Sequence, residues 1–140
     1  MNAHEPLADA SWIWSRQIKP DQYRCFRRKF SLSQLDPEAF VAIAADSDFV
    51  AYLNGKEVGR RQFSDLPERK TWAEFPVGTL LRRGENVLAV FVFYRGEDFM
   101  DYEAGPAGLL AALRVGQESV MTDSSWRTAP HPAFVAGRKE

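Results

Sequence analysis

An Asn-Gly pair at positions 54 and 55 lies between two runs in which apolar and polar residues alternate. A two-residue type I′ turn needs positive φ at both central positions, and Asn followed by Gly meets that need better than other pairs. Alternation with a period of two is typical of strands that bury one face. The segment Asp48–Gly59 (DFVAYLNGKEVG) therefore predicts a β-hairpin and, with it, an antiparallel β fold.

The turn also predicts which side chains share a face. Phe49, Ala51, Leu53 and Val58 are expected to lie on one face of the hairpin. The predicted cross-strand pairs are Leu53 with Lys56, Tyr52 with Glu57, and Ala51 with Val58.

Similar apolar runs, separated by turn residues, continue along the chain. About eight or nine short strands at a spacing of roughly 8–12 residues are the pattern of an all-β antiparallel sandwich or jelly roll. Besides the hairpin, the expected strands are Ser11–Trp14, Tyr23–Leu32, Phe40–Ala45, Thr71–Phe75, Glu85–Tyr94, Gly108–Val115 and Ser119–Thr122.

Two of these strands and one connection carry further expectations. Glu85–Tyr94 is apolar at nearly every position, which predicts a strand buried on both faces. Gly108–Val115 has a helix-like composition but the length of a strand, and we favour the strand. Pro76–Arg83 suits one helical turn that Gly84 would end.

Composition bounds the function classes. The 140 residues suffice for one domain, and the formal net charge of −1 gives no overall attraction to nucleic acid or anionic membranes. The basic cluster Arg24, Arg27, Arg28 and Lys29 lies on an expected strand, where such charges often guard a sheet edge. One cysteine, Cys25, and two histidines, His4 and His131, exclude an internal disulfide and a zinc cluster.

The two ends of the chain set the expected boundaries. The first residues lack a basic n-region and an apolar h-region, and no run of about 18 apolar residues exists, so a cytoplasmic protein without a membrane span is expected. Residues 1–10 are expected to be a tail and 11–128 the β-sandwich domain. Residues 129–140 are polar, contain two prolines and show no pairing partner, so they are expected to form a tail or the start of a linker.

The order of motifs along the chain is specific. It runs SWIW, YRCFRRKFSL, ADSDFVAYLNGKEVG, LLRRGENVLAVFVF, AGLLAALRV and TDSSWR. This order resembles the N-terminal β-sandwich domain of bacterial α-L-rhamnosidases over roughly Ser11 to Arg127. The central part is also similar to the sugar-binding jelly-roll domain of β-galactosidases and β-glucuronidases, although Ala107–Leu110 replaces their G-I-Y-R motif.

The resemblance implies a galactose-binding-type jelly roll and an accessory role. In both enzyme groups the catalytic carboxylates lie in a separate barrel domain, for which 140 residues leave no room. The chain alone is therefore expected not to be catalytic, while a parent protein would be a glycoside hydrolase. The implied partners are the catalytic domain of the same polypeptide and a carbohydrate.

The loop Tyr94–Gly105 (YRGEDFMDYEAG) places acidic residues among aromatic ones. Carboxylates accept pairs of sugar hydroxyls, and aromatic rings stack on the apolar face of a pyranose. In the resembling galactosidases this loop reaches the catalytic pocket. With Trp72 added as a stacking platform, the candidate ligand-binding residues are Trp72, Tyr94, Glu97, Asp98, Asp101 and Tyr102.

Other interpretations of these acids stay open. They could form an ordinary solvated loop. They could bind calcium, which takes oxygen ligands, although the D-x-D-x-D-G pattern is missing; no other cofactor is expected. A catalytic carboxylate pair would need a pocket that raises one pKa, and no catalytic residue is assigned.

The remaining tryptophans suggest a rival class of function. Trp12 and Trp14 share one face by their spacing, and such a patch could cover a neighbouring domain or form a homodimer. Trp126 is expected to close the core. A structural or protein-interaction domain without a sugar ligand therefore remains the alternative.

Overall fold

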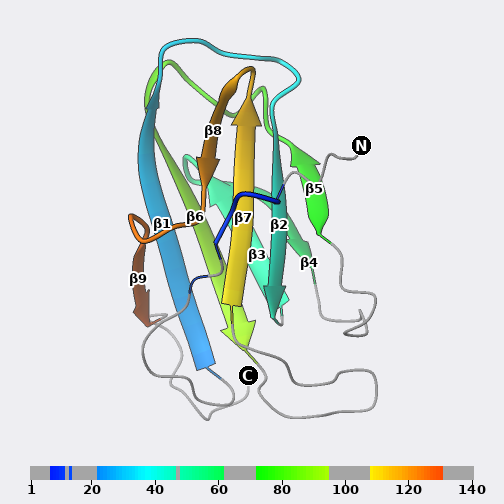
Figure 1. The fold of residues 1–140 in the computed structure, drawn as a ribbon, viewed down its shortest axis with the longest axis vertical. Coiled ribbons are helices and arrows are strands. Elements are labelled where there is room, and N and C mark those ends of the chain that lie inside the picture. The colour runs from blue at the N-terminus through cyan, green and yellow to red at the C-terminus, as the bar shows by residue number, and fades with distance from the viewer. Residues whose placement is uncertain are drawn as a thin grey trace.

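The computed structural model describes residues 7–11, 13, 22–46, 48–61, 72–94 and 108–130, and these form two antiparallel β-sheets packed face to face (Figure 1). One sheet has five strands in the order β4-β3-β6-β1-β9, and the other has four in the order β5-β2-β7-β8. The predicted all-β sandwich is confirmed. The strands are β1 Gln22–Leu32, β2 Phe40–Asp46, β3 Asp48–Leu53, β4 Lys56–Arg61, β5 Ala73–Pro76, β6 Gly84–Tyr94, β7 Gly108–Val115, β8 Glu118–Met121 and β9 Arg127–Pro130.

The Asn-Gly hairpin joins β3 to β4 as predicted. Asn54 and Gly55 have φ values of 54° and 86°, so both adopt the left-handed conformation of a type I′ turn. The pairs of Leu53 with Lys56 and of Tyr52 with Glu57 are confirmed.

The third predicted pair is wrong, because a β-bulge shifts the register and Ala51 pairs with Gly59 instead of Val58. The bulge brings a glycine close to the ring of Phe75 in β5. A Cβ at position 59 would lie 2.3 Å from that ring, so only glycine fits without movement. Val58 still packs against the core from a half-buried position.

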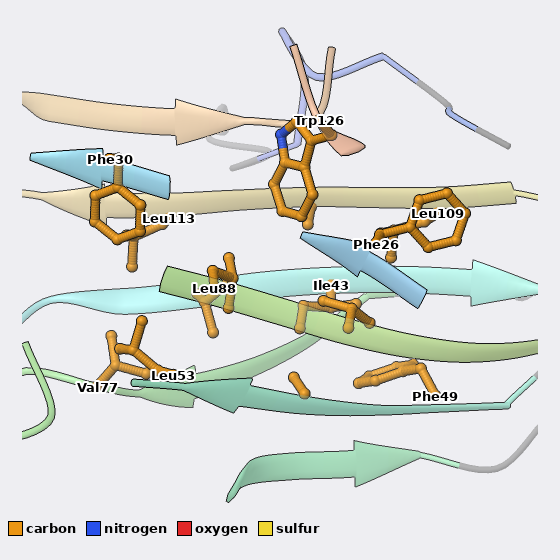
Figure 2. Packing of buried hydrophobic residues seen from close by; sticks show 14 of the residues in the cluster. Phe26, Phe30, Ile43, Phe49, Leu53, Val77, Leu88, Leu109, Leu113 and Trp126 are labelled. Atoms are coloured by element: carbon orange, nitrogen blue, oxygen red, sulfur yellow. The ribbon is translucent and has the colours of Figure 1, made fainter. Parts of the chain in front are cut away.

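The core fills the space between the two sheets (Figure 2). Alternate residues of each strand point into it, among them Phe26 of β1, Ile43 of β2, Leu88 of β6 and Leu113 of β7, all 0–1% exposed. Burying one side chain of this size contributes about 1.5–3 kcal/mol, so apolar burial is the main force that holds the sheets together.

The expectation that β6 is buried on both faces is wrong. Leu88, Val90 and Val92 point inward and are at most 2% exposed. Phe91 and Ala89, which alternate with them, are only half-buried. The reason is that the described strands form only two layers, so the outer face of the five-stranded sheet carries no third layer within them.

The outer face of the four-stranded sheet is partly covered by the N-terminal segment. Leu7 is 5% exposed and packs on Ala42 and Ala112. The Ser11 amide donates to the carbonyl of Thr122, and Ile13 forms an isolated bridge with Leu109. The expected strand at Ser11–Trp14 is thus seen only as this bridge, since Trp12 and Trp14 lie outside the described residues.

Other connections agree with the sequence in part. Gly108–Val115 is a strand, as favoured. The segment Pro76–Arg83 forms only a hydrogen-bonded turn, in which the Leu80 amide donates to the carbonyl of Val77, instead of a helical turn. Ala129 and Pro130, for which the sequence showed no partner, pair with Cys25 and Arg24 of β1. None of the described residues belongs to a helix that could cross a membrane.

Candidate functional site

The topology brings the predicted site residues Trp72 and Tyr94 to one end of the sandwich. Strand β2 ends at Asp46 and β3 begins at Asp48, so both strands meet there (Figure 1). The partner of Asp46 is Gly108 at the start of β7, and Asp48 pairs next to the end of β6. Strand β5, which follows Trp72, runs antiparallel to β2 and begins opposite Ile43, three residues before β2 ends, so Trp72 lies toward this end. We call it the Trp72 end.

The side chain of Trp72 is half-buried and fixed in orientation. Its Nε1 donates a hydrogen bond of 2.7 Å to Oε2 of Glu74, two residues along the strand. The ring packs beside the apolar group formed by Leu7, Ala42 and Ala112. Because the indole N–H is already used, any ligand would contact the ring by stacking.

The other predicted ligand-binding residues are placed only in part. Tyr94 is the last residue of β6, and its backbone lies opposite Gln22. Glu97, Asp98, Asp101 and Tyr102 lie outside the described residues. Within the described ranges there is no group of three or more His, Cys, Asp or Glu side chains that could hold a metal ion.

Asn54 and Asn86, from the two most distinctive motifs of the chain, contact each other directly. Nδ2 of Asn54 donates to Oδ1 of Asn86 at 2.9 Å and to the carbonyl of Leu80 at 3.0 Å. The Val87 amide donates to Oδ1 of Asn54 at 2.9 Å. Asn86 is 1% exposed and makes three further bonds to the backbone of the preceding turn. These hydrogen bonds give the two side chains a structural role, because they use them fully within the fold.

The expectation that the basic cluster guards a sheet edge is wrong for Arg24 and Arg27. Along these residues β1 lies between β6 and β9, whereas Arg28 and Lys29 lie beyond the residues that pair with β9. Arg24 points to the side of β9, where its Nη2 donates to Oγ1 of Thr128 at 3.2 Å, and burial lowers the pKa of its guanidinium. Arg28 donates to the carbonyl of Lys29, whereas Arg27 is exposed on the opposite face. The cluster is therefore divided between the two faces of the sheet.

Burial raises the pKa of the Cys25 thiol, although the nearby Arg24 acts in the opposite direction. A raised thiol pKa means less thiolate at neutral pH, which opposes a role as a nucleophile. We expect the alkylation rate of Cys25 by iodoacetamide to rise with pH through a midpoint above that of the same chain unfolded in urea. A midpoint at or below that of the unfolded chain would contradict the burial effect.

One surface was not predicted from the sequence. Half-buried side chains of β1, β3 and β6 line the outer face of the five-stranded sheet, and we call six of them the outer stripe: Cys25, Val50, Tyr52, Val87, Ala89 and Phe91. The rings of Tyr52 and Phe91 lie 5.4 Å apart at an interplanar angle of 52°. The uninterrupted apolar run of β6 concealed this surface, because apolar residues fill both of its faces.

Comparison with known structures identifies the fold. A GH78 family rhamnosidase from Bacillus sp. GL1 superposes with a TM-score of 0.81 and 33% sequence identity over 87% of this chain. The chain resembles one domain of a rhamnosidase. An α-L-rhamnosidase from Streptomyces avermitilis, solved with L-rhamnose, gives a TM-score of 0.70 and 25% identity over 94% of this chain. The predicted resemblance to a rhamnosidase β-sandwich domain is therefore confirmed.

The matches cover most of this chain but only a small part of each rhamnosidase. The chain spans only 13% and 14% of the two rhamnosidase chains. A lectin from Pleurotus ostreatus, solved with GalNAc, matches 90% of this chain and 36% of its own, with 26% identity and a TM-score of 0.65. No family model and no curated protein sequence matches this chain.

Proposed function

We propose that this β-sandwich is a non-catalytic accessory domain of a glycoside hydrolase, most similar to an α-L-rhamnosidase, that packs on a catalytic domain. The observation that carries the proposal is the unequal coverage: 87–94% of this chain corresponds to 13–14% of the rhamnosidase chains. A unit of this kind occupies a small part of a long polypeptide in those enzymes.

We further propose that the Trp72 end contributes to sugar binding. The similarity to a lectin solved with GalNAc supports a carbohydrate ligand. The fixed indole of Trp72 offers a face on which a pyranose ring can stack. Glu97, Asp98 and Asp101, which follow β6 in the sequence, would accept sugar hydroxyls through their carboxylates.

A structural or protein-interaction domain without a sugar ligand is the second candidate. The outer stripe favours it, since a half-buried apolar surface on a small domain often marks a protein contact. The two candidates use different surfaces, so they can be tested separately.

Titration of the ¹⁵N-labelled chain with L-rhamnose, galactose, GalNAc and glucuronic acid tests the sugar proposal by amide and indole shifts. We expect saturable shifts for the Trp72 indole and the amides of Tyr94–Gly105, with a dissociation constant of about 1 mM. The buried indole of Trp126 serves as an internal control that should not shift. Repeating the titration with calcium and with EDTA tests whether the acidic loop needs a cation.

Two results would count against the proposal. No saturable shift for any sugar up to about 50 mM, a concentration fifty times the expected dissociation constant, would leave the structural candidate. Equal shifts in a Trp72→Leu variant would place the sugar elsewhere on the domain. A variant that retains the dispersed spectrum of the folded chain is needed for this comparison.

A further inference from the structure

Three cationic side chains lie together on the outer face of the five-stranded sheet. Arg27 and Lys29 alternate along β1 with inward-pointing side chains such as Phe26, so both point outward, and both are exposed. Arg127 of β9 lies directly across from Arg27 and is exposed as well. We call these three residues the basic triad. By the spacing of antiparallel strands, their Cβ atoms lie within about 5–8 Å of one another.

The charges of the basic triad are not neutralised by the described part of the chain. None of the three side chains forms an ion pair with a described carboxylate. The residues of β6 opposite Arg27 and Lys29 are apolar, and Glu85, farther along β6, makes no ion pair with Lys29. Like charges directly opposite each other, such as Arg27 and Arg127, destabilise a strand pair. An anion bound from outside would relieve this repulsion.

The chemistry of the basic triad favours a carboxylate ligand. A guanidinium group binds a carboxylate through two parallel hydrogen bonds, and the triad presents two such groups beside one ammonium. The formal net charge of the chain is −1, so an anion would be held by these local charges and not by the overall charge.

We propose that the basic triad binds an acidic polysaccharide through the carboxylates of its uronate residues. Carboxylates on neighbouring sugars contact different members of the triad, so several weak contacts act together along one polymer. The similarity to a lectin solved with GalNAc supports a carbohydrate ligand, and the inference rests on the proposed carbohydrate role to that extent. The surface is a different one, because Trp72 packs on the four-stranded sheet.

Two other classes of anionic partner fit this surface less well. An acidic protein would need an apolar centre beside its charges, and the two aromatic rings of the outer stripe, Tyr52 and Phe91, already contact each other. Single-stranded nucleic acids need exposed aromatic rings for stacking, and domains that bind duplexes are strongly basic overall. A polysaccharide that carries carboxylates needs neither feature.

Titration of the ¹⁵N-labelled chain with short alginate oligomers, in which every sugar is a uronate, tests the proposal. We expect saturable shifts of the amides of Arg27, Lys29 and Arg127. Raising NaCl from about 20 mM to about 300 mM should weaken the binding severalfold, because salt screens exposed charges. Combining Arg27→Gln with Arg127→Gln should raise the dissociation constant about tenfold.

A matched control removes two charges elsewhere. Lys56→Gln with Arg61→Gln changes the net charge by the same amount on β4, the edge strand at the far side of the sheet, and should leave the dissociation constant unchanged. Thermal unfolding of each variant confirms that the fold is retained. Dextran, a neutral polysaccharide, should cause no shift of the triad amides.

Four outcomes would overturn the proposal. They are the absence of saturable triad shifts at low salt with uronate on the order of 10 mM, an equal loss of affinity in the control variant, equal shifts with dextran, and tighter binding of a DNA duplex. The sugar site at the Trp72 end is judged separately by its own indole signal. Triad shifts with alginate but no response of Trp72 to any neutral sugar would leave this inference standing and contradict that site.

Discussion

Replacing Asn86 with Ala is expected to lower the free energy of unfolding by about 3 kcal/mol, although the side chain is polar. Oδ1 of Asn86 accepts bonds from the Arg82 amide at 3.0 Å and from Nδ2 of Asn54 at 2.9 Å. Its Nδ2 donates to the carbonyls of Arg82 at 2.8 Å and Gly84 at 3.1 Å. Because the site is 1% exposed, the variant leaves several of these groups buried without a partner, which costs more than the bonds contributed.

Urea unfolding followed by tryptophan fluorescence measures this loss. Asn54→Gly removes the partner side chain of the same network. Glycine keeps the positive φ of the turn, so this variant tests the loss of the Asn54 amide alone. We expect it to cost about 1–2 kcal/mol, and the double variant to cost less than the sum of the two, because they share one hydrogen bond. A loss below about 1 kcal/mol for Asn86→Ala would mean that water replaces the amide and that the network stabilises little.

The hairpin and most strands were predictable because they depend on local information. Positive φ at Asn54 and Gly55 and period-two alternation act within a few residues of each other. The bulge that pairs Ala51 with Gly59 was not predictable from the hairpin sequence, and the close approach of Gly59 to the ring of Phe75 involves a strand of the other sheet. The pairing of β9 with β1 also joins residues about a hundred positions apart, and Pro130 argued against a strand.

The candidate site was predictable to a smaller extent. Trp72 was predicted as a stacking platform from its sequence alone, and the structure adds its bond to Glu74 and its position beside Leu7. The role of Asn86 was missed because a buried amide cannot be told from a solvated one without its tertiary partners. The outer stripe was missed because Phe91 alternates with equally apolar inward residues.

Replacing Trp126 with Ala should destabilise the domain by about 3–5 kcal/mol, because it removes the largest side chain that closes the core. Trp126 lies between β8, which belongs to the four-stranded sheet, and β9, which belongs to the five-stranded sheet. Its ring is 7% exposed and points into the space between the sheets, as predicted (Figure 2). Its Nε1 donates to the carbonyl of Met121 at 2.9 Å.

Trp126→Phe separates the two contributions in the same urea experiment. Phenylalanine keeps most of the apolar contact and removes the donor, so we expect a loss of about 1–2 kcal/mol, well below that of the alanine variant. A loss as large as that of Trp126→Ala would mean that the bond to Met121, and not apolar burial, fixes the connection between the sheets.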